Sequence, residues 1–171
     1  MNLLEVPIGR HAPGVINVVI EIPRGSRKRY EYNPQQNRFD VEYRFSIPIP
    51  TEYGWIPETL SIDNEHVDAM VITRHLMQPG YVCEARPIGT LKRKDKDHKV
   101  ICVAINDDKC RHIQDTSDLD AKLLKKITSF FEPYFELDGW LGIEETYEFI
   151  KESCARYLAN KKGAQDASND N

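Results

Sequence analysis

The chain has 171 residues, of which 40% are hydrophobic and 29% are charged, which suits a single globular domain rather than a disordered chain. The net charge of −4 argues against broad binding to nucleic acid or to anionic membranes, although it leaves room for a local basic pocket. Charges and prolines interrupt residues 1–30, and no apolar run is long enough to cross a bilayer, so a cytoplasmic protein without membrane association is expected.

The first two thirds of the chain predict short strands separated by turns. Residues 15–23 are rich in β-branched side chains and end at a proline, and residues 28–32 alternate like a second strand. Three prolines at positions 48, 50 and 57 predict an irregular segment around residues 53–55, because proline removes a hydrogen-bond donor and restricts its neighbour. Further strands are expected at residues 39–45, 69–72, 81–86, 89–91 and 99–105.

The character of the sequence changes near residue 118. Asp118 is suited to cap a helix, which continues with apolar residues at helical spacing as far as Phe131. A second helix is expected at residues 144–158, and the polar residues 161–171 predict a disordered tail after a single domain at residues 1–160. Short strands followed by two helices predict an α+β fold, mainly β, in which two C-terminal helices pack against a small barrel.

Residues 63–68 bring three carboxylates, from Asp63, Glu65 and Asp68, into six positions. An isolated acidic turn is more often a solvated loop, but apolar neighbours on both sides of this one limit how far it extends into solvent. Clustered carboxylates repel one another unless a cation or a proton intervenes, and hard divalent cations prefer oxygen ligands. The spacing differs from that of an EF-hand loop, which disfavours calcium binding of that kind.

A second acidic pair, Asp95 and Asp97, lies inside the basic run 92–99. Such a run is often a soluble hairpin tip. If the backbone there is extended, however, Asp95, Asp97 and Lys99 point to the same side and suit a complex of a metal ion with phosphate. Glu21 and Glu31 are further acids that, taken alone, indicate surface charge. The sequence contains no P-loop, Rossmann or hydrolase-elbow motif.

The acidic cluster resembles the signature of soluble family I inorganic pyrophosphatases, which has the form D-[SGDN]-D-[PE]-[LIVMF]-D. Residues 63–68 stand here as D-N-E-H-V-D, and the resemblance extends over residues 4–158. The resemblance implies an OB-like five-stranded β-barrel with two helices, assembled as a homo-oligomer, usually a hexamer. Flanking segments that stand in the family's order are residues 53–54, 58–61, 78–80, 86–89, 112–113, 118–119 and 130–132.

The same resemblance implies hydrolysis of inorganic pyrophosphate to two phosphates by a metal-activated water, without a covalent enzyme intermediate. The implied cofactor is Mg²⁺, with several ions per site and with Mn²⁺ or Zn²⁺ as substitutes. The positions implied for metal ligands are Asp63, Asp68, Asp95, Asp97, Glu21 and Glu31.

Catalytic roles follow from the resemblance for two further residues. Glu65 stands beside the expected nucleophilic water, and Tyr53 shapes the site. The positions implied for substrate binding are Arg29, Arg44, Lys99 and Tyr134.

Several positions differ from the family's pattern. Glu65 replaces an Asp, so its carboxylate reaches one methylene further, and Arg29 replaces a Lys. Phe135 replaces another Lys and removes a phosphate contact, while Ile49 and His66 replace a Tyr and a Pro. These differences keep an alternative open, namely a catalytically degenerate pyrophosphatase-like protein that binds phosphate-containing ligands or a protein partner. A nucleic-acid module of the OB type is a third interpretation, which the acidic residues disfavour.

Overall fold

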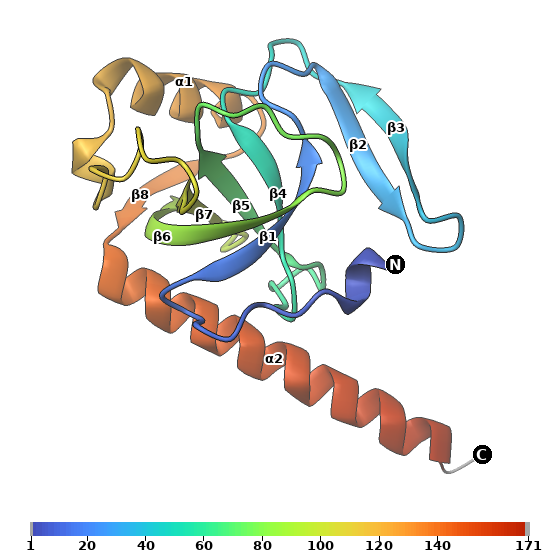
Figure 1. Cartoon of the computed structure of the whole chain (residues 1–171). Helices are drawn as coiled ribbons and strands as arrows, with labels where there is room; N and C mark the ends of the chain where they lie inside the picture. Colours follow the sequence, from blue (N-terminus) through green and yellow to red (C-terminus); the bar gives the residue numbers. More distant parts are fainter. Residues whose placement is uncertain (1, 170–171) are drawn as a thin grey trace.

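Five strands close into a β-barrel, shown in Figure 1 for the computed structural model, which describes residues 2–169. Neighbouring strands are antiparallel except for one parallel pair, and the last strand pairs with the first to complete the circle. The predicted OB-like barrel, within an α+β fold that is mainly β, is thus confirmed. The order around the barrel is β1 (Ile16–Ile22), β4 (Glu52–Ile56), β5 (Val67–Ile72), β7 (Lys99–Ala104) and β6 (Val82–Arg93).

Two further elements extend the barrel. β8 (Leu137–Leu141) adds a strand by pairing with β6. β2 (Lys28–Asn33) and β3 (Arg38–Arg44) form a separate hairpin that stands beside the barrel in Figure 1. The hairpin turns through Asn37, whose φ of 48° is a left-handed conformation that asparagine tolerates better than most residues.

α1 (Ala121–Phe131) packs on the barrel through three buried apolar residues near its C-terminal end. It begins after Asp120, whose side chain accepts a hydrogen bond from the backbone N–H of Lys122. The start predicted at Asp118 is therefore too early. Asp118 instead closes a capping box in the preceding 3₁₀ turn, Thr116–Asp118. Its side chain therefore stabilises the start of this turn rather than the start of α1.

α2 (Ile143–Asn169) packs against β6 on a different side of the barrel from α1, and Figure 1 shows its C-terminal half extending past the barrel. Ile150 is buried in this contact, and the hydroxyls of Thr146 and Thr90 share a hydrogen bond of 2.8 Å. The helix continues beyond its predicted end at residue 158, because alanine and lysine on both sides of Gly163 favour helix. Residues 161–169 of the expected tail are thus helical, and residues 170–171 lie outside the described part of the chain.

Three strands differ from the sequence prediction. β4 occupies the segment expected to be irregular, because Pro50 and Pro57 lie just outside it and its residues are buried between β1 and β5. The two strands expected at 81–86 and 89–91 are one strand, β6, which continues past an irregularity after Pro87. β8 was not predicted because Asp138 and Gly139 indicate a break, and Gly139 adopts a φ of 84° within the strand.

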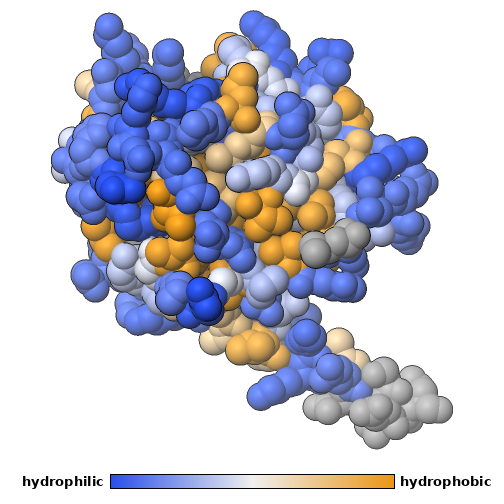
Figure 2. Space-filling model, in the orientation of Figure 1, coloured by the Kyte–Doolittle hydropathy of each residue, from blue (hydrophilic) through white to orange (hydrophobic). Residues whose placement is uncertain are grey.

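Most large apolar side chains lie inside the barrel and beneath the helices. Figure 2 shows one face of the molecule, where hydrophilic side chains cover most of the surface and apolar ones form separate patches between them. Within residues 2–169, no helix combines the length and the apolar character that crossing a membrane requires.

Gly54 lets β4 lie unusually close to β1. A Cβ atom at this position would lie 1.9 Å from the carbonyl oxygen of Val19, which is a backbone atom of the neighbouring strand and cannot easily move. Gly54→Ala is therefore expected to lower the free energy of unfolding by about 3 kcal/mol or more, measured by urea unfolding. Gly14→Ala is the matched control, because its nearest contact would be an ordinary 3.5 Å. Equal stability of the two variants would contradict this packing argument.

Candidate active site

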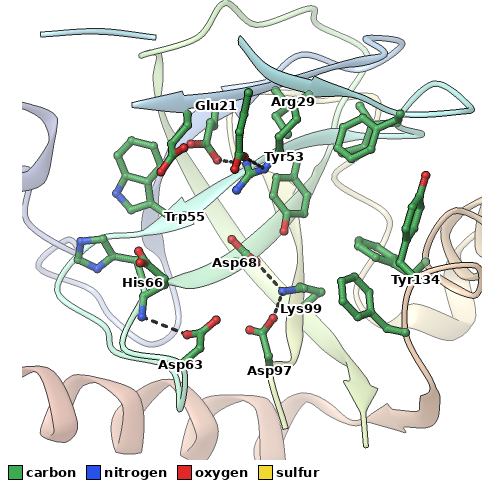
Figure 3. A pocket seen from close by; sticks show the side chains of 18 of the residues that line it. Glu21, Arg29, Tyr53, Trp55, Asp63, His66, Asp68, Asp97, Lys99 and Tyr134 are labelled. Carbon is green, nitrogen blue, oxygen red and sulfur yellow. Dashed lines mark hydrogen bonds and ion pairs between the residues drawn. The ribbon is translucent and has the colours of Figure 1, made fainter. Parts of the chain in front are cut away.

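A cavity of about 410 Å³ opens between one end of the barrel, the β2–β3 hairpin and the segment that follows α1. Figure 3 shows acidic and basic side chains from these elements pointing into it. Arg44 and Asp95 are the two residues of the predicted site that do not line the cavity. The predicted residues that do are Glu21, Arg29, Glu31, Tyr53, Asp63, Glu65, Asp68, Asp97, Lys99 and Tyr134.

Lys99 stands between two carboxylates at the centre of the site. The parallel register of β5 and β7 places Asp68 directly beside Lys99, and Asp97 precedes Lys99 by two residues. The Lys99 ammonium donates hydrogen bonds of 2.5 Å to Asp68 and 2.6 Å to Asp97. Burial opposes its charge, but the two carboxylates outweigh that effect and raise the pKa of Lys99. Burial also raises the pKa of Asp97, despite the attraction of Lys99.

Glu21 and Arg29 form a second charged pair, on the wall made by β1 and β2. The Arg29 guanidinium donates a hydrogen bond of 2.7 Å to the buried Glu21 carboxylate. Burial nevertheless raises the pKa of Glu21 to about 7, because desolvation exceeds the stabilisation that Arg29 provides. Tyr53 is buried beside this pair, and burial together with the charge of Asp68 raises its pKa well above the usual value. Its hydroxyl therefore stays protonated and available as a donor.

The acidic loop between β4 and β5 carries Asp63 and Glu65 at the rim of the cavity. Both are exposed, and the Asp63 carboxylate accepts a hydrogen bond of 3.0 Å from the backbone N–H of Glu65. His66 is fixed by its ring, which stacks on Trp55 and lies with Nδ1 2.8 Å from the carbonyl oxygen of Thr59. The loop is thus partly a solvated acidic turn, as an isolated acidic turn usually is. Its Asp63 and Glu65 carboxylates nevertheless line the charged cavity.

Arg44 and Asp95 point elsewhere for identifiable reasons. The β2–β3 register shifts between Arg29 and Tyr30, so the adjacent residues Glu42 and Tyr43 both line the cavity, whereas Arg44 is exposed outside it. Asp95 lies in the turn before β7, where its side chain is half exposed and forms an ion pair with Arg93. Its other oxygen accepts a hydrogen bond of 3.2 Å from the backbone N–H of Asp97.

Arg93 lines the cavity and was missed by the sequence analysis. It is the last residue of β6, only 5% exposed, and its guanidinium pairs with both Asp95 and Asp97. The guanidinium carbon lies 3.3 Å from the centre of the Phe135 ring. The available signal was alternation, because Arg93 follows the buried Leu91 by two residues and faces the same side of β6. The basic run around it indicated a solvated tip instead.

The donor set of the cavity suits hard divalent cations. Its acidic ligands are carboxylate oxygens, which Mg²⁺ and similar ions prefer, and the raised pKa values of Glu21 and Asp97 mark negative charge that the protein alone neutralises incompletely. Among the described residues, no three acidic, histidine or cysteine side chains are already grouped around a common point. Cationic nitrogens of Lys99 and Arg93 lie between the carboxylates in this arrangement.

Glu21 gives the metal-free protein a pH dependence that can be measured. Its pKa of about 7 exceeds the ordinary value of 4.5, so between these values the folded protein holds a proton that the unfolded chain has lost. The free energy of unfolding therefore falls as pH rises from about 4.5 to 7, by about 3 kcal/mol, and is then level with respect to this group. Glu21→Gln is expected to remove that fall. Chemical unfolding in a chelator at several pH values measures it, and parallel profiles for the two proteins would contradict it.

Comparison with known proteins identifies the family. The family model described as inorganic pyrophosphatase matches residues 18–158. An inorganic pyrophosphatase of Methanosarcina acetivorans is 35% identical, with 86% of this chain and 95% of the relative covered, and that of Saccharolobus solfataricus is 39% identical with the same coverage. The crystal structure of the Thermus thermophilus inorganic pyrophosphatase superposes with a TM-score of 0.86 at 33% identity, covering 92% of this chain and 99% of that one. The chain therefore belongs to the inorganic pyrophosphatase family.

Proposed function

We propose that the protein hydrolyses inorganic pyrophosphate to two phosphates, using a water molecule activated in the carboxylate site. The observation that carries the proposal is the juxtaposition of Asp68, Asp97 and Lys99 in a cavity of a chain that belongs to the inorganic pyrophosphatase family. Pyrophosphate carries several negative charges, so its hydrolysis requires cations beside the phosphoryl oxygens and a base or metal beside the attacking water.

A divalent metal is implied by the family, and in our proposal it is Mg²⁺, several ions per site, with Mn²⁺ or Zn²⁺ as substitutes. Asp63, Asp68 and Asp97 would hold the ions, with Glu21 and Glu31 adding negative charge from the opposite wall. When bound, such ions lower the pKa of a coordinated water and neutralise the oxygens of the phosphoanhydride. Asp95 lies outside the cavity and is paired with Arg93. It would join these metal ligands only if that ion pair opened.

Other side chains of the cavity would position the substrate. Arg29 and Lys99 would supply positive charge for the phosphoryl oxygens, and the half-exposed Tyr134 hydroxyl, which lies 3.3 Å from that of Ser46, would donate to them. The Tyr53 hydroxyl, which stays protonated beside Asp68, would donate to that carboxylate. Glu65 at the rim would orient the attacking water. Arg44 is expected to contribute only if the exposed edge of the hairpin closes over the substrate.

The wider setting is part of the same proposal. The protein acts on pyrophosphate as a small-molecule substrate in the cytoplasm, as a homo-oligomer and, by resemblance, a hexamer. Neither nucleic acid nor a membrane is needed for the reaction.

The test is phosphate release by the purified protein from pyrophosphate, tripolyphosphate and ATP, each with Mg²⁺, Mn²⁺, Zn²⁺ or a chelator. The expected result is rapid release from pyrophosphate that depends on a divalent ion, is fastest with Mg²⁺ and exceeds release from the longer phosphoanhydrides. Absence of release with every ion, from protein that is folded by circular dichroism, would overturn the proposal. Glu65→Asp and Phe135→Lys then identify the cause, since a large gain from near-zero activity would indicate a degenerate site.

A further inference from the structure

Arg93 is a buried cation that lies between two acids of the predicted metal-ligand set. Its Nη1 donates a hydrogen bond of 2.6 Å to Asp97, and its Nη2 pairs with Asp95. The same Oδ2 atom of Asp97 also accepts the hydrogen bond from Lys99. One guanidinium therefore joins the two carboxylates through two different nitrogens and supplies positive charge between them.

The position of this guanidinium is fixed by its surroundings. Arg93 is only 5% exposed, and the carbon of its guanidinium lies 3.3 Å from the centre of the Phe135 ring. Its Nε atom is buried and has no hydrogen-bond partner among the described residues. The backbone N–H of Arg93 donates to Nδ1 of His98 at 3.1 Å, across the turn that carries both acids. The side chain is thus held by strand, ring and turn together, and moving it would expose a buried charge.

The positive charges beside these acids already offset most of their negative charge. Asp68, Asp95 and Asp97 carry three negative charges, and Arg93 and Lys99 supply two positive ones. Arginine does not lose its proton in proteins, so this neutralisation persists at every relevant pH. A divalent cation at the Asp95–Asp97 pair would have to displace the buried guanidinium from both carboxylates.

We propose that Arg93 is a built-in counter-cation that takes the place of one divalent ion at the Asp95–Asp97 pair. Asp95 is then a partner of Arg93 rather than a metal ligand, and the divalent ions that the site binds are held by Asp63, Asp68 and Asp97. Arg93 is a positioning residue, because it acts through the carboxylate of Asp97. The inference rests on the proposed function for its chemistry, but it concerns the number of bound ions and not the reaction rate.

The test is the number of Mn²⁺ ions bound per chain, measured by equilibrium dialysis without pyrophosphate. Arg93→Met is expected to bind one ion more than the wild type, because it frees Asp95 and removes one of the two cations that pair with Asp97. Lys92→Met is the matched control: Lys92 is the preceding residue of β6, faces the opposite side and pairs with Asp138 at 3.2 Å. It is expected to bind the wild-type number of ions. Equal numbers for wild type and Arg93→Met would overturn the inference.

A second variant keeps the inference testable if Arg93→Met does not fold. Asp95→Asn changes a half-exposed side chain, and it is expected to leave the number of Mn²⁺ ions bound by the otherwise wild-type protein unchanged. Loss of one ion in Asp95→Asn would show that Asp95 is a metal ligand and would contradict the inference. If the wild-type protein binds Mn²⁺ but releases no phosphate, the proposed function is contradicted while the inference about the number of bound ions still stands. Failure of the proposed function can therefore be distinguished from failure of the inference about Arg93.

Discussion

Asp68→Asn lowers kcat for pyrophosphate hydrolysis by about 10²–10³-fold, in the range seen when a group aligned with the reacting centre is lost or displaced. Asp68 is the one carboxylate that touches Lys99 from β5, and it interacts with the Tyr53 hydroxyl. Asparagine has the same shape but lacks the charge that pairs with the Lys99 ammonium and that, in our proposal, holds a divalent ion. The measurement is the initial rate of phosphate release at saturating Mg²⁺ and pyrophosphate.

The matched control for Asp68→Asn is Asp138→Asn. Asp138 is a half-exposed acid on β8 that pairs with Lys92 and does not line the cavity. Its replacement is expected to leave kcat within about twofold, since exposed ion pairs contribute little. A kcat for Asp68→Asn close to that of the control would contradict the assignment of Asp68 to the reacting centre.

Lys99→Met produces the second large effect, which appears in stability as well as in activity. Lys99 is 2% exposed and separates the carboxylates of Asp68 and Asp97, so its removal leaves two half-buried acids facing each other. Breaking a buried ion pair by removal of one partner costs about 3–5 kcal/mol. The metal-free variant is therefore expected to lose about 3 kcal/mol of its free energy of unfolding. Millimolar Mg²⁺ is expected to restore part of this loss, because the ion replaces the missing positive charge.

Urea unfolding with and without Mg²⁺ measures this effect. Lys94→Met is the control, because Lys94 is exposed in the same basic run and pairs with Glu136 at the surface. Its stability is expected to stay within about 0.5 kcal/mol of the wild type in both conditions. A Lys99→Met protein that is as stable as Lys94→Met without metal would contradict the central ion pair.

The barrel and both helices were predictable because their signals are local. Runs of β-branched residues produce β1, β5 and β7, and apolar spacing produces α1. The errors occur where tertiary pairing overrides local preference. β4 forms between flanking prolines because β1 and β5 bury it on both sides, and β8 forms despite Gly139 because β6 offers it an open edge.

The residues of the candidate site also differ in whether local sequence or strand pairing determines their position. Asp63 and Asp68 were identified from spacing within one loop, and the parallel register of β5 and β7 brings Lys99 to Asp68. Arg44 and Arg93 show the limit of such reasoning, because the side to which a strand residue points depends on where the strand begins and ends. β6 continues to Arg93 because β8 pairs with it there, beyond the last β7 pair at Leu91, and apart from the alternation with Leu91 the basic run indicates a solvated tip.

The most direct test of the account follows the conversion of pyrophosphate to phosphate by ³¹P nuclear magnetic resonance, with wild-type protein in Mg²⁺, wild-type protein in a chelator, and Asp68→Asn in Mg²⁺. The account predicts that the pyrophosphate signal is replaced by a single phosphate signal in the first sample, with little change in the other two over the same time. A pyrophosphate signal that persists in the first sample, or one that disappears equally in all three, would contradict metal-dependent hydrolysis at this carboxylate site.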